Sequence, residues 1–214
     1  MITVRMWFTK LDEAAYISLL DLQRVMGRAL KRARIPAWYS LGFNPHVYLT
    51  FAAPLALGHE SMVESMDFKT EDENFDFAAA KDALAASMPN GMQVLSLVPA
   101  VMAADKIAFA EYEISWSAAH AALMQTAIES YNALAEAPVQ KKTKRGMKTI
   151  NLKEYVKDMA ITSGKTTLLL PAGNVLNINP ELLLVFLHGL GGAPYEEARV
   201  LRTKLLTKDM ETFQ

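Results

Sequence analysis

The chain has 214 residues, no cysteine and a formal net charge of −1 at pH 7. The lack of cysteine excludes disulfides, thiolate metal sites and iron–sulfur clusters held by this chain. No run of about 18 apolar residues is present, which excludes a transmembrane helix, and the four histidines lack metal-ligand spacing. The first residues alternate as in a strand and do not resemble a signal peptide. We expect a cytoplasmic protein that holds no metal or cofactor.

The first half of the chain is predicted to follow the order β-α-β-β-α-β. Apolar and polar residues alternate over Ile2–Thr9, as in a half-buried strand. Ser18 and Asp21 form a capping pair for a helix that must end before Pro36. The remaining elements are strands near 47–53 and 62–69, a helix from Asn74 to Ser87, and a strand from Met92 to Val98.

The second half is predicted to repeat that order. Its expected elements are a strand at Ile107–Trp116, a helix capped by Ser117, strand candidates at 138–152 and 165–170, a helix opened by Asn179-Pro180 and a strand at Ala198–Leu206. The order is typical of the split βαβ, or ferredoxin-like, arrangement. We therefore expect an α+β fold with antiparallel sheets and two tandem ferredoxin-like halves, at residues 1–99 and 106–214.

Positive charge is segregated along the chain. Residues 1–58 and 138–214 are net basic, whereas residues 59–137 are net acidic. Four cations of the first helix fall on one side of it: Arg24, Arg28, Lys31 and Arg32. A chain with two basic ends can present a cationic surface even when its overall charge is close to zero.

The segment Ser40–His46 has an unusual composition, rich in Gly, Asn, Pro and His. Such a loop exposes hydrogen-bonding groups, and sites often lie on loops held by a rigid scaffold. Trp38 precedes the loop, and Asn44 and His46 end it. Cations beside aromatic rings suit single-stranded nucleic acid, with contacts to phosphates and stacking on bases. The alternative is a turn whose Asn and His bond their own backbone, with Trp38 in the core.

A second basic segment lies between residues 141 and 148. Its cations are Lys141, Lys142, Lys144, Arg145 and Lys148. These side chains could neutralise phosphates and give salt-sensitive binding of low sequence specificity. The alternative is the solvated tip of a hairpin.

Two other sequence patterns are typical of ligand binding, but a structural role is favoured for each. Arg5 and Trp7 would lie on the open sheet face, where related layouts stack RNA bases, but burial of that face against the other half is favoured. The Ser163-Gly164-Lys165 run is similar to the end of a phosphate-binding loop. However, Met159 occupies the position of the first glycine and a strand follows, so a hairpin turn is predicted.

Five segments have a specific pattern: Tyr16–Arg24, Arg28–Ala33, Ile35-Pro36, Ser40–Gly58 and Glu60-Ser61. Together they resemble the radical-SAM-associated protein family. This bacterial family carries a domain of unknown function and is encoded beside, or fused to, a radical SAM protein. The resemblance is dense over residues 1–70 and weaker from 141 onward. It implies a radical SAM partner with its own cluster, but no established activity. Leu19 stands where the family usually has His, and Val47-Tyr48 where it has Pro and a basic residue.

These observations favour a non-catalytic accessory protein of a radical SAM enzyme that binds tRNA or rRNA through basic surfaces. One alternative is a subunit that only binds proteins. Another is an RNA-modifying or RNA-processing enzyme with His46 as general acid or base, Asp21 as its partner, and Arg24 or Arg32 on a phosphate. The RNA hypothesis requires the scattered cations to gather in one groove.

Overall fold

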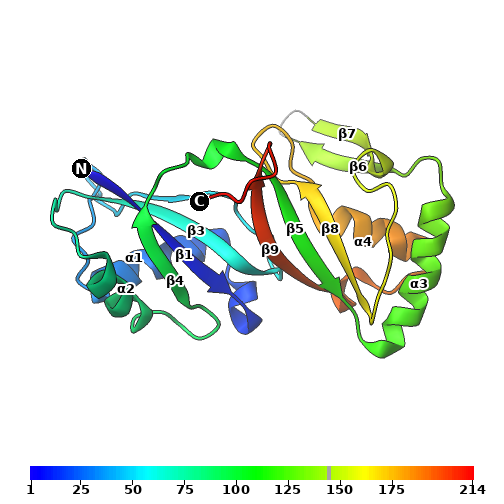
Figure 1. Ribbon diagram of the computed structural model, residues 1–214, viewed down its shortest axis with the longest axis horizontal. Coiled ribbons are helices and arrows are strands. Elements are labelled where there is room, and N and C mark those ends of the chain that lie inside the picture. The colour runs from blue at the N-terminus through cyan, green and yellow to red at the C-terminus, as the bar shows by residue number, and fades with distance from the viewer. Residues whose placement is uncertain (144–145) are drawn as a thin grey trace. The chain divides into compact units, whose positions relative to one another are not determined.

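The computed structural model describes residues 1–143 and 146–214, which divide into two compact units (Figure 1). Unit 1 comprises Met1–Ile107 together with Thr212–Gln214, and unit 2 comprises Ala108–Glu211. Both units combine helices with mostly antiparallel strands, so the chain has an α+β fold. Within the described ranges, no helix has both the length and the apolar character needed to cross a membrane.

Unit 1 has the element order predicted for the first half. Its elements are β1 (Ile2–Lys10), α1 (Leu19–Arg32), β2 (Leu49–Phe51), β3 (Glu60–Thr70), α2 (Phe77–Ala85) and β4 (Val94–Pro99). The strands lie in the order β4-β1-β3-β2, and each neighbouring pair is antiparallel. The core joins one face of β1 to the apolar stripe of α1, through residues that include Val4, Met6, Phe8, Leu22, Met26 and Leu30.

The start of α1 follows the predicted cap. The Ser18 Oγ accepts a hydrogen bond from the Asp21 N–H at 3.2 Å, which satisfies a free donor of the first turn. The helix ends at Arg32, because Arg34 adopts a left-handed φ of 55° and Pro36 follows. The positions of these two helix ends determine which α1 side chains face residues 39–49.

The start of α2 corrects the prediction from Asn74. Asp76 is the cap, and its Oδ1 accepts hydrogen bonds from the N–H groups of Ala78 and Ala79, both at 3.0 Å. Asn74 instead donates its own N–H to the Asp72 Oδ1 at 2.9 Å. Several short polar side chains compete for the cap in this stretch, and spacing alone does not select among them.

The opposite face of the unit 1 sheet is closed around Arg5, which is fully buried. Its guanidinium donates to both carboxylate oxygens of Asp67, at 2.8 and 2.7 Å, and to the carbonyl oxygens of Met102 (2.8 Å) and Gln214 (2.6 Å). The Phe213 ring lies 4.4 Å from it. The residues that cover Arg5, from the linker and the C-terminus, belong to unit 1 itself, whereas the sequence prediction assigned this role to the other half.

Unit 2 contains β5 (Ile107–Ser115), α3 (Ala118–Ala133), β6 (Pro138–Thr143), β7 (Gly146–Asn151), β8 (Lys165–Pro171), α4 (Pro180–Gly189) and β9 (Arg199–Thr207). The strands β9-β5-β8 form its sheet, and β6-β7 form a separate two-stranded hairpin. Ser163 and Gly164 have φ values of 52° and 74° between two paired residues, so the hairpin-turn interpretation is confirmed.

Candidate functional site

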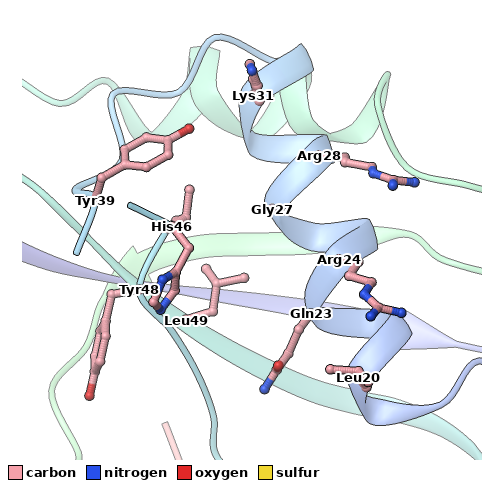
Figure 2. Close-up of a pocket in the computed structure, with 11 residues that line it drawn as sticks. Leu20, Gln23, Arg24, Gly27, Arg28, Lys31, Tyr39, His46, Tyr48 and Leu49 are labelled. Atoms are coloured by element: carbon pink, nitrogen blue, oxygen red, sulfur yellow. The ribbon is translucent and has the colours of Figure 1, made fainter. Parts of the chain in front are cut away.

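A groove of about 540 Å³ lies between α1 and residues 39–49 of unit 1 (Figure 2). Its lining consists of Leu20, Gln23, Arg24, Gly27, Arg28, Lys31, Tyr39, His46, Val47, Tyr48 and Leu49. Three of these described residues are cations and none is a carboxylate. Negative ligands are therefore favoured over positive ones at this groove.

The α1 side of the groove follows from helical spacing, since residues three or four positions apart share a face. Figure 2 shows Gly27 on the side of α1 that faces Tyr39 and His46, with Gln23 and Lys31 at neighbouring turns. The guanidinium groups of Arg24 and Arg28 extend away from His46 in this view. The two arginines thus form the rim of the groove, and Gly27 forms part of its floor.

The rim cations differ in their partners. Arg24 forms an exposed ion pair with Asp21 at 2.9 Å, and such pairs contribute little to stability. Hydrogen bonds from the Ser18 hydroxyl and then from Arg24 lower the pKa of Asp21. The side chains of Arg28 and Lys31 form neither a hydrogen bond nor an ion pair with any described residue. They remain available to an external anion.

The loop from Ser40 to His46 is closed by its own hydrogen bonds. The Ser40 N–H donates to the His46 carbonyl at 2.8 Å, and the His46 N–H donates to the Ser40 Oγ at 3.2 Å. The His46 Nδ1 lies 3.2 Å from the Asn44 carbonyl oxygen and 3.0 Å from the Ser40 Oγ. Because a carbonyl only accepts, this contact favours the tautomer with the proton on Nδ1. Nε2 is then an acceptor with no described partner.

The aromatic side of the groove is formed by Tyr39 and Tyr48. Both are partly exposed. Tyr48 has an edge contact with Trp38, with ring centroids 6.2 Å apart, and the Lys69 Nζ lies 5.7 Å from the Tyr48 ring. Trp38 is half-buried and does not line the groove. The aromatic rings in the lining are therefore those of the two tyrosines and not that of Trp38, the aromatic residue predicted from sequence.

The other first-half candidates lie outside the groove lining. The Arg32 Nη2 donates to the Ser87 carbonyl at 2.6 Å, beyond the end of α2. Asn44 is exposed in the loop and contributes its carbonyl oxygen to His46. The Asp21 carboxylate makes no hydrogen bond to His46 in the described structure, since its partners are Ser18 and Arg24. Among the described residues, the hydrogen bonds of the His46 side chain are to Ser40 and Asn44, and none is to a carboxylate.

The basic segment of unit 2 lies on the β6-β7 hairpin. The Lys141 Nζ donates to the Asn177 carbonyl, and burial, followed by the charge of Lys148, lowers the pKa of Lys141. Lys142 and Lys148 are exposed, which agrees with a solvated hairpin. Lys144 and Arg145 lie outside the described residues. This segment and the groove belong to different units.

A second cavity, of about 450 Å³, lies between β6 and α4. Its lining includes Lys141, Lys142, Glu181, Leu182 and Phe186, so both signs of charge are present. Over the part of the chain that the structure describes, no three His, Asp or Glu side chains are placed to hold a metal ion. The unit 1 groove has the more uniform charge and is the stronger candidate site.

Seven residues of the groove lining were absent from the candidates predicted from sequence: Leu20, Gln23, Gly27, Tyr39, Val47, Tyr48 and Leu49. Gly27 could have been noticed in the sequence, because a glycine inside a predicted helix lowers its stability relative to alanine.

A comparison with known families matched residues 3–180 to a model described as an uncharacterized protein conserved in bacteria (DUF2344). The matched region includes the whole groove and the β6-β7 hairpin. A comparison with curated proteins found no match.

Proposed function

The chain belongs to the DUF2344 family of uncharacterized proteins conserved in bacteria, and on this premise we propose that unit 1 binds single-stranded RNA in the groove between α1 and residues 39–49. The observation that carries the proposal is the convergence of three cations and two tyrosines on one groove whose described lining contains no carboxylate. Cationic side chains attract phosphates, and tyrosine rings stack on unpaired bases.

The proposal includes a ferredoxin-like plan for both units. In unit 1 it is supported by the β-α-β-β-α-β order with the strand arrangement β4-β1-β3-β2. In unit 2 the sheet β9-β5-β8 keeps three strands of that plan, and the β6-β7 hairpin takes the place of the fourth. RNA-recognition domains of this layout use the open sheet face. In unit 1 that face is closed around Arg5, so the RNA site is assigned to the groove.

The proposed role is that of a non-catalytic accessory protein that presents tRNA or rRNA to a radical SAM enzyme in the cytoplasm. The resemblance of residues 1–70 to radical-SAM-associated proteins supports the partner. The lack of a carboxylate hydrogen bond to His46 among the described residues supports a binding role over acid–base catalysis.

Filter retention of labelled tRNA and of a single-stranded oligonucleotide tests the proposal at salt concentrations of about 50 and 200 mM. Retention should fall steeply with salt for the wild type. Arg28→Gln should weaken binding and reduce the salt slope by about 0.7, the value for one phosphate contact on a single strand. Arg32→Gln is the matched control, because Arg32 is on the same helix but bonds Ser87 outside the groove.

The RNA proposal fails if the wild type retains no RNA in a salt-sensitive manner, either alone or with its radical SAM partner. It also fails if Arg28→Gln and Arg32→Gln behave alike, because the groove would then make no distinct contribution.

A second function, binding only to protein, is favoured by one observation. Leu41 is 91% exposed and Phe43 is fully exposed at the tip of the closed loop. Exposed aromatic side chains of this kind are common anchors at protein interfaces. In gel filtration with the purified radical SAM protein, Leu41→Ser/Phe43→Ser should abolish co-elution and leave RNA retention unchanged. Co-elution of the double variant at wild-type strength would reject this use of the loop.

A further inference from the structure

Gly27 has no structural reason to be glycine within the described chain. It lies inside α1, where glycine destabilises a helix relative to alanine. A Cβ added at this position would meet no atom within 4 Å, and its φ is not in the left-handed region. Neither close packing nor backbone conformation therefore requires it. The helix accepts a destabilising residue whose open side faces the groove (Figure 2).

The surface around Gly27 is suited to an apolar group. The N–H and C=O groups in the middle of α1 are bonded within the helix, so they offer no donors to a phosphate. The neighbouring lining includes the apolar side chains of Leu20, Val47 and Leu49. The cations stand at the rim, with the guanidinium groups of Arg24 and Arg28 directed outward. The groove thus combines an apolar floor with a cationic border.

This inference rests on the proposed function. We propose that Gly27 keeps the floor of the groove open for one unpaired nucleobase, while the adjoining phosphates lie at the rim beside Arg28 and Lys31. A base presents flat apolar faces, which match a helix surface without a side chain and the ring of Tyr39. A base-paired duplex hides those faces, and a bare phosphate chain has none. The ligand class is therefore a single-stranded, base-bearing polynucleotide.

The test measures binding of three ligands of equal charge by fluorescence anisotropy. They are a single-stranded oligoribonucleotide, an abasic phosphodiester chain and a hairpin duplex. The wild type should prefer the oligoribonucleotide over the abasic chain by roughly tenfold, the contribution of one stacked base. Gly27→Leu fills the floor and should remove this preference, with the salt-dependent binding of the abasic chain retained.

Gly27→Ala provides a second variant in case leucine disturbs the fold. It should raise the melting temperature by about 2 °C, since alanine favours the helix, and yet weaken binding of the oligoribonucleotide. Gly189→Ala is the matched control: Gly189 lies in α4, and a Cβ there also meets no atom within 4 Å. It should leave the preference for bases intact.

The outcomes separate the two proposals. Equal, salt-sensitive binding of the oligoribonucleotide and the abasic chain by the wild type overturns the role of Gly27 and leaves phosphate binding standing. Persistence of the base preference in both folded Gly27 variants also overturns it. If the wild type binds none of the three ligands, the proposed RNA function is itself rejected.

Discussion

Unit 1 holds positive charge in two regions that differ in how the charge is satisfied. Arg5 is buried on one side of the sheet with Asp67, two carbonyl oxygens and the Phe213 ring around it. Arg28 and Lys31 stand at the groove without a partner among the described residues. Removal of a buried cation leaves its partners unpaired and destabilises the fold, whereas an exposed cation without partners contributes little to stability and is free for a ligand.

The largest expected effect is on stability, at the buried region. Arg5→Leu leaves the Asp67 carboxylate without its partner and should reduce the free energy of unfolding by about 3–5 kcal/mol. Urea denaturation measures this loss. Arg5→Leu/Asp67→Leu should recover a large part of it, because no unpaired charge remains. If Arg5→Leu unfolds at the wild-type midpoint, the Arg5 cluster does not hold unit 1 together.

At the groove we expect a large effect on RNA affinity and no effect on stability. Arg28→Glu/Lys31→Glu should lower the affinity for single-stranded RNA by roughly a hundredfold, given two lost charge-assisted contacts. Its urea midpoint should equal that of the wild type. Lys142→Glu/Lys148→Glu on the unit 2 hairpin is the matched charge reversal, with an expected loss of only a few-fold. Equal losses in the two variants would remove the distinction between the groove and the hairpin.

Tyr39 tests the aromatic part of the groove, with a smaller expected effect. Tyr39→Ala should weaken RNA binding by roughly tenfold through loss of one stacked base, and the salt slope should not change. Tyr39→Phe keeps the ring and should bind as the wild type does. A change of slope in Tyr39→Ala would indicate that the ring acts through the cations instead.

The smallest expected effect is the pH dependence of unit 2. Burial, followed by the charge of Asp158, raises the pKa of Tyr131 from 10.0 to about 12, and its hydroxyl donates to the Val156 carbonyl at 2.7 Å. Between these pH values the unfolded chain has lost a proton that the folded chain keeps, so stability falls as pH rises. Melting temperatures across this range should fall less steeply for Tyr131→Phe. Parallel curves for the two proteins would contradict the shift.

Local features of α1 were predictable from sequence because they depend on near neighbours. Ser18 caps the helix by accepting from the Asp21 N–H as expected, and Leu22 and Met26 are buried on its apolar face. The sequence did not predict that Lys31 lines the groove while Arg32 bonds Ser87 outside it. Consecutive helical residues are separated by about 100° around the axis, and only the tertiary return of residues 39–49 decides which of them borders a groove.

Long-range contacts account for the other differences. Alternation along β1 placed Arg5 on the open face, but its cover by Phe213 and Gln214 joins the two ends of the chain and leaves no local signal. Similarly, the run of lysine and arginine residues predicted a basic segment from residue 141. It did not predict that the Lys141 side chain donates a hydrogen bond to the Asn177 carbonyl. His46 and Tyr48 enter the groove because their segment returns across α1, which periodicity does not reveal.

The most direct test of the central claim is the position of RNA on the protein. Single-stranded RNA containing 4-thiouridine can be crosslinked by light to the wild-type chain and the modified peptides identified by mass spectrometry. Crosslinks within residues 39–49 and on α1, lost in Arg28→Glu/Lys31→Glu, are the predicted result. Crosslinks confined to unit 2, or unchanged in that double variant, would contradict the assignment of RNA binding to the groove.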